Sequence, residues 1–212
     1  MIKRITIVFV SFMMLIMGNL ALASKTPDPM KMLKNTTGTL IDKLQNNQKK
    51  LHQDPDFVYK IINNVLLPKV DVRVMSMSVL GRNAWRNASE QQRKAFTQAF
   101  TKTVIKTYAS ALKEYQDQKV TFQPLRGGYE GKHVLDIDSH IVQKDGNKVP
   151  ISYSLIRNDG EWKIYDLNVE GISLLQSFRS QFASELAQGK SIDEIIEELK
   201  QHNKKLNNNG NS

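Results

Sequence analysis

The stretch that decides the fold covers residues 133–169 and reads HVLDIDSHIVQKDGNKVPISYSLIRNDGEWKIYDLNV. Apolar and polar residues alternate along it, which is typical of strands that bury one face. Two reversals interrupt it, at Asp145–Gly146 and Asp159–Gly160, where glycine supplies the positive φ that tight hairpins require. With one more strand expected at 120–125, the pattern predicts four antiparallel strands in meander order.

Helical patterns precede and follow these strands in the sequence. The capping box formed by Ser89 and Gln92 starts the longest of them, and a second capping box at Ser191 and Glu194 starts the last. The expected helices cover residues 33–51, 55–67, 71–80, 90–115, 174–188 and 192–199. We therefore predict an α+β fold in which a four-stranded antiparallel sheet curls against several helices, with an apolar cavity between them.

The helix expected at 90–115 carries an apolar stripe with several aromatic side chains at near four-residue steps. A face this bulky needs a broad apolar partner, and the inward face of the sheet is the simplest one. We expect the lipid-binding or core residues to be Phe96, Phe100, Val104, Tyr108, Leu135, Ile137, Ile141, Ile151, Tyr153, Leu155, Trp162, Ile164, Phe178 and Phe182. The periodicity does not separate a fully packed core from a core that holds an apolar ligand.

The first residues predict export. Lys3 and Arg4 precede an uncharged apolar stretch, and Ala21–Leu22–Ala23 supplies the small-x-small cleavage signal. A retained membrane anchor is the alternative, but the apolar stretch is short for a spanning helix. We expect residues 1–23 to be a signal peptide, 24–200 to be a single lipid-binding domain, and 201–212 to be a disordered polar tail.

The chain has no cysteine, which excludes disulfides, thiolate metal sites and a cysteine nucleophile. Its formal net charge is +9, which often indicates a nucleic-acid partner. Export makes nucleic acid an improbable partner, so anionic membrane surfaces or acidic proteins are the better candidates. A surface that is basic only for solubility is the alternative.

One group of residues invites a catalytic interpretation. Asp136, Asp138 and His140 alternate along a predicted strand, so they share one face and could hold a metal or act as acid and base. The opposite face of that strand carries leucine and isoleucine and should meet the helices, which leaves the polar trio toward water. We therefore predict no catalytic residue, no metal site and no cofactor, and interpret the protein as a non-enzyme.

Residues spread over nearly the whole chain resemble the MlaC family of periplasmic phospholipid carriers, also called toluene-tolerance proteins. The resemblance runs from about residue 33 to residue 199. It rests on Asp71, Val79–Arg82, Trp85, Ser89–Arg93, Phe96, Phe100, Tyr108, Leu112, Tyr153, Leu155, Trp162, Tyr165, Asp166, Glu170, Gly171, Ser173 and Arg179–Phe182. Polar Asn83 and small Ala84 depart from the family, which often has aromatic residues there.

The resemblance implies a monomeric periplasmic protein that takes a whole glycerophospholipid, with the acyl chains inside and the headgroup in water. Its implied partners are an outer-membrane lipoprotein complex and an inner-membrane ABC transporter with a lipid-binding ring subunit. The implied role is to maintain the lipid asymmetry of the outer membrane. Such a carrier needs an apolar lining, because exposing about 30 methylenes to water costs roughly 24 kcal/mol.

Exposed cations near the expected cavity mouth are candidates for headgroup or partner docking. These are Arg82, Arg86, Arg126 and Lys132, and plain surface solubility is the alternative explanation for them. Two other functions stay open from the sequence. One is a small cone-shaped α+β hydrolase or isomerase with Asp138 and His140 as acid and base, and the other is a periplasmic interaction module without a ligand.

Overall fold

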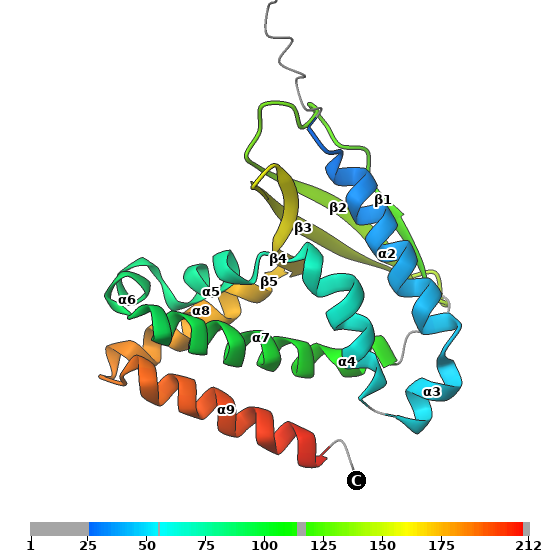
Figure 1. Cartoon of the computed structure of the whole chain (residues 1–212). Coiled ribbons are helices and arrows are strands. Elements are labelled where there is room, and N and C mark those ends of the chain that lie inside the picture. Colours follow the sequence, from blue (N-terminus) through cyan, green and yellow to red (C-terminus); the bar gives the residue numbers. More distant parts are fainter. Residues whose placement is uncertain (1–25, 55, 114–117, 210–212) are drawn as a thin grey trace, which may run out of the picture.

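The computed structural model describes residues 26–54, 56–113 and 118–209, so the predicted signal peptide lies outside the described residues (Figure 1). It confirms the α+β class and the antiparallel meander, with strand order β1-β2-β3-β4-β5. The strands are β1 Lys119–Phe122, β2 Val134–Val142, β3 Lys148–Asn158, β4 Glu161–Val169 and β5 Ile172–Ser173. The predicted number of four strands is wrong. A turn through Gly171, with φ of 85°, lets the short β5 fold back and pair with the end of β4.

The described helices and helical turns are α2 Pro29–Gln45, α3 Gln48–Gln53, α4 Phe57–Ile61, the π-helical turn η1 Ile62–Leu66, the 3-10 turn η2 Leu67–Lys69, α5 Val72–Leu80, α6 Arg82–Asn87, α7 Glu90–Lys113, α8 Leu174–Ala187 and α9 Ile192–Asn209. The helix predicted at 33–51 is in fact two helices, with a break at Asn46 and Asn47. The Asn47 side chain donates to the carbonyl of Lys43 (2.8 Å), a local bond that competes with helix continuation.

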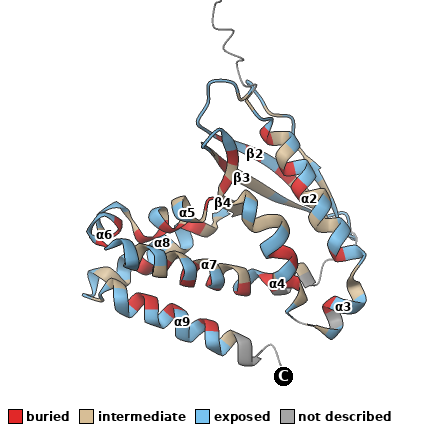
Figure 2. Ribbon diagram, viewed as in Figure 1, coloured by how far each residue is buried: buried red, intermediate tan, exposed pale blue. Residues whose placement is uncertain are grey.

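The predicted packing of the long helix against the sheet is wrong, because α2 covers the inward face of the sheet instead (Figure 1). Leu33 of α2 is 1% exposed and packs with Leu135, Ile137 and Leu155. α7 lies among the other helices, beside α5 and α9. Its stripe residues Phe96 and Phe100 pack on the aromatic rings of α8, so the helices bury one another's apolar faces, as the facing red segments in Figure 2 show.

The predicted disorder of the tail is also wrong for the part that the structure describes, because α9 continues through Asn209. Asn203 is buried against α7, where its side-chain amide donates to the carbonyl of Ala99 (3.0 Å) and accepts from Thr103 Oγ1 (3.2 Å). Lys106 Nζ donates to the backbone carbonyl of Asn203 (2.7 Å). These contacts hold a polar sequence in a helix that its composition alone does not favour.

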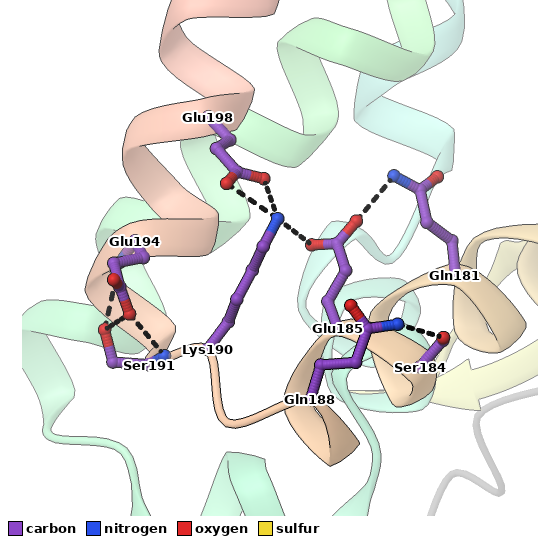
Figure 3. Close-up of polar contacts among 8 residues, drawn as sticks. All are labelled: Gln181, Ser184, Glu185, Gln188, Lys190, Ser191, Glu194 and Glu198. Carbon is purple, nitrogen blue, oxygen red and sulfur yellow. Dashed lines mark hydrogen bonds and ion pairs between the residues drawn. The ribbon is translucent and has the colours of Figure 1, made fainter.

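A group of polar contacts fixes the junction between α8 and α9 (Figure 3). Lys190 donates to both carboxylate oxygens of Glu198 (2.7 Å each) and lies 3.8 Å from Glu185. The predicted capping box is confirmed, since the Ser191 backbone N–H donates to Glu194 Oε2 (2.8 Å) and the Glu194 N–H to Ser191 Oγ (3.3 Å). The junction therefore holds α9 in the direction that lets it lie along α7.

Candidate functional site: an apolar cavity and its open cleft

The buried side chains form three separate clusters. The sheet cluster is Leu33, Leu135, Ile137, Leu155, Trp162 and Ile164. The aromatic cluster is Val79, Leu80, Trp85, Phe96, Ala99, Phe100, Leu175, Phe182, Ile195, Ile196 and Leu199, with Phe178 packed against it. The α4 cluster is Leu44, Leu51, Val58, Ile61, Ile62 and Ala109. Each cluster packs tightly within itself, so the space between the clusters is where a ligand could enter.

A cavity of about 90 Å³ lies at the point where the three clusters meet. Ile164 belongs to the sheet cluster, while Val104 packs against the aromatic cluster and Ile105 against the α4 cluster. The full lining is Leu66, Leu67, Val70, Val72, Met75, Thr101, Val104, Ile105, Ile164, Asp166, Leu167 and Leu174. We call this space the apolar cavity, because nearly all of these side chains are aliphatic.

The one acidic member of this lining, Asp166, is occupied by hydrogen bonds of its own. Asp166 accepts from Ser173 Oγ (2.6 Å) and from the backbone N–H groups of Leu167 (2.8 Å) and Leu175 (3.1 Å). These bonds join the end of β4 to the start of α8. The carboxylate is therefore structural, and the cavity presents an apolar surface to a guest.

A larger open cleft of about 670 Å³ lies between α4 and α7 and shares part of its lining with the apolar cavity. The shared residues are Leu67, Val72, Thr101 and Ile105. The rest of the cleft is lined by Asp56, Tyr59, Lys60, Asn63, Thr97, Gln98, Lys102 and Lys106. We call it the α4–α7 cleft. Its floor is apolar where it borders the cavity, and its rim is polar and carries three lysines and one aspartate.

Lys106 is the most perturbed cation of this cleft. It is 9% exposed. Burial lowers the pKa of Lys106, the like charge of Lys102 lowers it further, and Asp56 partly opposes both effects. The cleft therefore has a positive potential near α7 that the described residues do not fully neutralise.

Of the predicted lining residues, Val104 and Ile164 lie at the apolar cavity. The others are divided between the clusters: Leu135, Ile137, Leu155 and Trp162 lie under α2, and Phe96, Phe100, Phe178 and Phe182 lie among the helices. Tyr153 packs on the sheet cluster, Ile141 and Ile151 are half-buried, and Tyr108 is 39% exposed. Tyr153 accepts a bond from Ser139 Oγ (3.3 Å), and burial raises the pKa of Tyr153.

The sequence interpretation missed most of the cavity wall, above all Leu66, Leu67, Ile105 and Leu167. The signal that was available is the pair Leu66 and Leu67 directly before Pro68, where the helix must end. The chain there forms a π-helical turn followed by a 3-10 turn. π-helical turns are rare and often lie at functional sites.

The cations predicted for docking lie away from the cavity. Arg82 and Arg86 are exposed on α6, whereas Arg126 and Lys132 are exposed in the loop between β1 and β2, in a different part of the molecule (Figure 1). None of them lines the apolar cavity or the α4–α7 cleft. Docking of a partner at these residues stays a prediction.

The polar trio of β2 lies on the face of the sheet opposite to the sheet cluster. Asp136 and Asp138 are exposed, and Asp136 accepts from Ser154 Oγ (2.6 Å). His140 Nδ1 lies 3.2 Å from Gln123 Nε2. In the part of the chain that the structure describes, no three His, Asp or Glu side chains are grouped so that they could hold a metal ion. Nor is any helix within those ranges long and apolar enough to cross a membrane.

Comparison with known proteins gives consistent results at the levels of sequence and fold. The chain is 29% identical over 179 residues to toluene tolerance protein ttg2D of Pseudomonas putida, covering 84% of this chain and 81% of the relative. It is 28% identical over 176 residues to the intermembrane phospholipid transport system binding protein MlaC of Haemophilus influenzae, covering 82% and 81%.

The fold is similar to that of the phospholipid-binding protein from Ralstonia solanacearum, solved in complex with a phospholipid. The TM-score is 0.78 at 21% identity, over 85% of this chain and 99% of that one. The family model described as MlaC protein matches residues 34–201. This match spans most of the chain and confirms the resemblance seen in the sequence. The protein therefore belongs to the MlaC family.

Proposed function

We propose that this protein is a phospholipid carrier that binds whole lipid molecules, with the acyl chains in the apolar cavity and the headgroup in the α4–α7 cleft. The observation that carries the proposal is the shared wall of these two spaces, formed by Leu67, Val72, Thr101 and Ile105. An apolar space that borders an open cleft with a polar rim matches the two chemical halves of a phospholipid. The name of the Haemophilus relative and the phospholipid in the Ralstonia structure support the same ligand.

The cavity must enlarge before it can take acyl chains. At about 90 Å³ it is smaller than an engineered protein cavity of about 150 Å³ that binds benzene. Since the cavity lies between clusters, it can enlarge at their borders, and the α4 cluster then gives up its contact with Ala109 of α7. The newly exposed surface is aliphatic on all sides, so acyl chains can replace the contacts that opening removes.

The segment from α4 to η2 is the best candidate for the moving wall. Directly after it, Asp71 anchors the chain to the sheet: its N–H donates to the carbonyl of Ile164 (2.8 Å), and its carboxylate accepts from Asn158 Nδ2 (3.0 Å). The irregular turns η1 and η2 lie between this anchor and α4. We infer that α4 and these turns swing away from α7 and β4 while Asp71 stays in place.

The finer role that we propose is transport between the outer-membrane lipoprotein complex and the inner-membrane ABC transporter, in the periplasm, to maintain the lipid asymmetry of the outer membrane. The apolar N-terminal stretch that ends in Ala21–Leu22–Ala23 supports export. The relative named as a binding protein of an intermembrane phospholipid transport system supports this pathway. In this role the protein binds and releases lipid as a monomer and catalyses no reaction.

Native mass spectrometry of the protein purified from cells, followed by organic extraction, tests the proposal. We expect one diacyl phospholipid per chain. Val104→Phe, which fills the cavity from α7, should lower the lipid-bound fraction at least fivefold. Ala183→Phe adds the same ring at an exposed position of α8 and should leave the fraction unchanged. A wild-type protein that carries no lipid and acquires none from phospholipid vesicles would overturn the proposal.

The double variant Asp138→Asn with His140→Asn separates the carrier from an enzyme that uses these two residues. Both side chains lie outside the cavity and the cleft, so a carrier should keep its lipid and its exchange rate. If the variant instead stopped the breakdown of a lipid that the wild-type protein consumes, the trio would be catalytic.

A further inference from the structure

Lys102 lies beside the wall that the α4–α7 cleft shares with the apolar cavity. It is exposed on α7 and lines the α4–α7 cleft. Its neighbour Thr101 and, one helical turn further, Ile105 form the wall shared by the cleft and the cavity. One turn of helix is about 5.4 Å, which is the scale of the separation between the first acyl carbons of a phospholipid and its phosphate.

Lys102 also differs from the other cations of the cleft in its contacts. Lys60 is paired with Asp54 (3.3 Å), and Lys106 donates to the carbonyl of Asn203 (2.7 Å). Lys102 makes no hydrogen bond or ion pair with any residue that the structure describes, and Asp56 is the one acid among the described residues lining this cleft. Its ammonium group is therefore available to an anionic ligand.

The surroundings of Lys102 favour such a ligand. The like charge of Lys102 lowers the pKa of Lys106, and the groove on the other side of Lys102 is lined by Lys200 and Lys204. An anion placed between these side chains would remove part of their mutual repulsion.

We propose that Lys102 binds the phosphate group of a phospholipid whose acyl chains occupy the apolar cavity. This inference rests on the proposed carrier function and adds a headgroup site to it. A phosphodiester is common to many phospholipids, so the site retains lipids that carry a phosphate and discriminates against neutral diacylglycerols. A lysine suits this task because its ammonium donates to phosphate without demanding one fixed orientation.

Binding of two soluble short-chain ligands tests the inference with delipidated protein. The probes are dihexanoyl-phosphatidylglycerol and dihexanoylglycerol, both used below their critical micelle concentrations, so attraction to a membrane surface does not contribute. Lys102→Glu should raise the Kd for the phosphatidylglycerol about tenfold and leave the Kd for the diacylglycerol unchanged. Lys102→Arg should keep wild-type affinity for both probes. Lys94→Glu, an equal charge change on α7 outside the cleft, should have no effect on either.

The outcomes separate this inference from the proposed function. If the wild-type protein binds both probes and Lys102→Glu changes neither Kd, or weakens both equally, the headgroup site is wrong and the carrier function stands. If the wild-type protein binds neither probe, the carrier function itself fails. Inorganic phosphate serves as the third probe. Phosphate binding as tight as that of the short-chain lipid, and lost in Lys102→Glu, would identify a site for free anions and overturn the lipid assignment.

Discussion

Trp162 has a buried polar atom without a partner. The side chain is 2% exposed within the sheet cluster, and its Nε1 makes no hydrogen bond with any described residue. The Arg157 guanidinium lies 6.0 Å from the ring centroid, over its face. Burial of the apolar area of the indole thus stabilises the sheet. Burial of its N–H without a hydrogen-bond partner opposes this, because the N–H loses its hydration.

Replacing Trp162 with Phe should therefore cost little stability. Trp162→Phe keeps an aromatic ring and removes the unpaired donor, so we expect the free energy of unfolding to stay within about 1 kcal/mol of wild type. Trp162→Ala leaves a cavity and should lower it by about 3–5 kcal/mol. Urea denaturation, monitored by circular dichroism, measures the free energy of unfolding of both variants. A Phe variant as unstable as the Ala variant would mean that the N–H has a partner in solution.

Among the elements, those with local signals could be predicted from the sequence. The capping box at Ser89 and the glycine at position 81, with φ of 83°, gave the limits of α7 and α5 to within a few residues. The short strand β5 and the extension of α9 beyond residue 199 had no such signal and were missed. β5 depends on its pairing with β4, and the extension of α9 is held by the buried contacts of Asn203, which the sequence does not reveal.

The candidate site was less predictable than the elements. An apolar stripe on a helix shows that the helix is buried, but it does not show which element buries it. Both α2 and α7 carry such stripes, and the choice of α2 as the cover of the sheet places the phenylalanines of α7 away from it. The cavity wall comes from six elements, and no short stretch of sequence brings them together.

The junction of α8 and α9 should depend on pH in a defined direction. Hydrogen bonds from Ser191 hold the pKa of Glu194 below its usual value, and the Glu198 carboxylate raises the pKa of Lys190 (Figure 3). The contribution of Glu194 is present above its pKa in the unfolded chain and is lost as the pH falls through the lower folded value. The contribution of Lys190 is present below its unfolded pKa and is lost as the pH rises through the higher folded value.

We therefore expect amide protection at the start of α9 to be greatest near neutral pH and to fall in acid. Hydrogen exchange with mass spectrometry, expressed as protection factors, measures this for peptides that cover residues 191–199. Glu194→Gln can keep the capping bonds without the titrating carboxylate, so its protection should vary less over the acid range. Equal acid sensitivity in the wild-type protein and this variant would show that another group controls the junction.

At the scale of the whole molecule, the chain has three small cores in place of one large one, and no disulfide joins them. The apolar cavity lies where these cores meet, so a lipid in it would contact all of them. A ligand that binds only the folded state at a free concentration 100 times its Kd adds about 2.7 kcal/mol of stability. For a domain of this size that corresponds to a Tm increase of about 5–10 °C.

Lipid removal should therefore lower the Tm of the wild-type protein by about 5–10 °C, measured by differential scanning calorimetry before and after delipidation. The cavity-filled variant Val104→Phe should melt at the same temperature before and after, because its side chain already joins the cores that the acyl chains would join. The exposed variant Ala183→Phe should respond to delipidation as the wild-type protein does. If delipidation lowered the Tm of Val104→Phe by as much as that of the wild-type protein, the stabilising lipid would bind outside the apolar cavity. The cores would then be linked by side-chain packing alone.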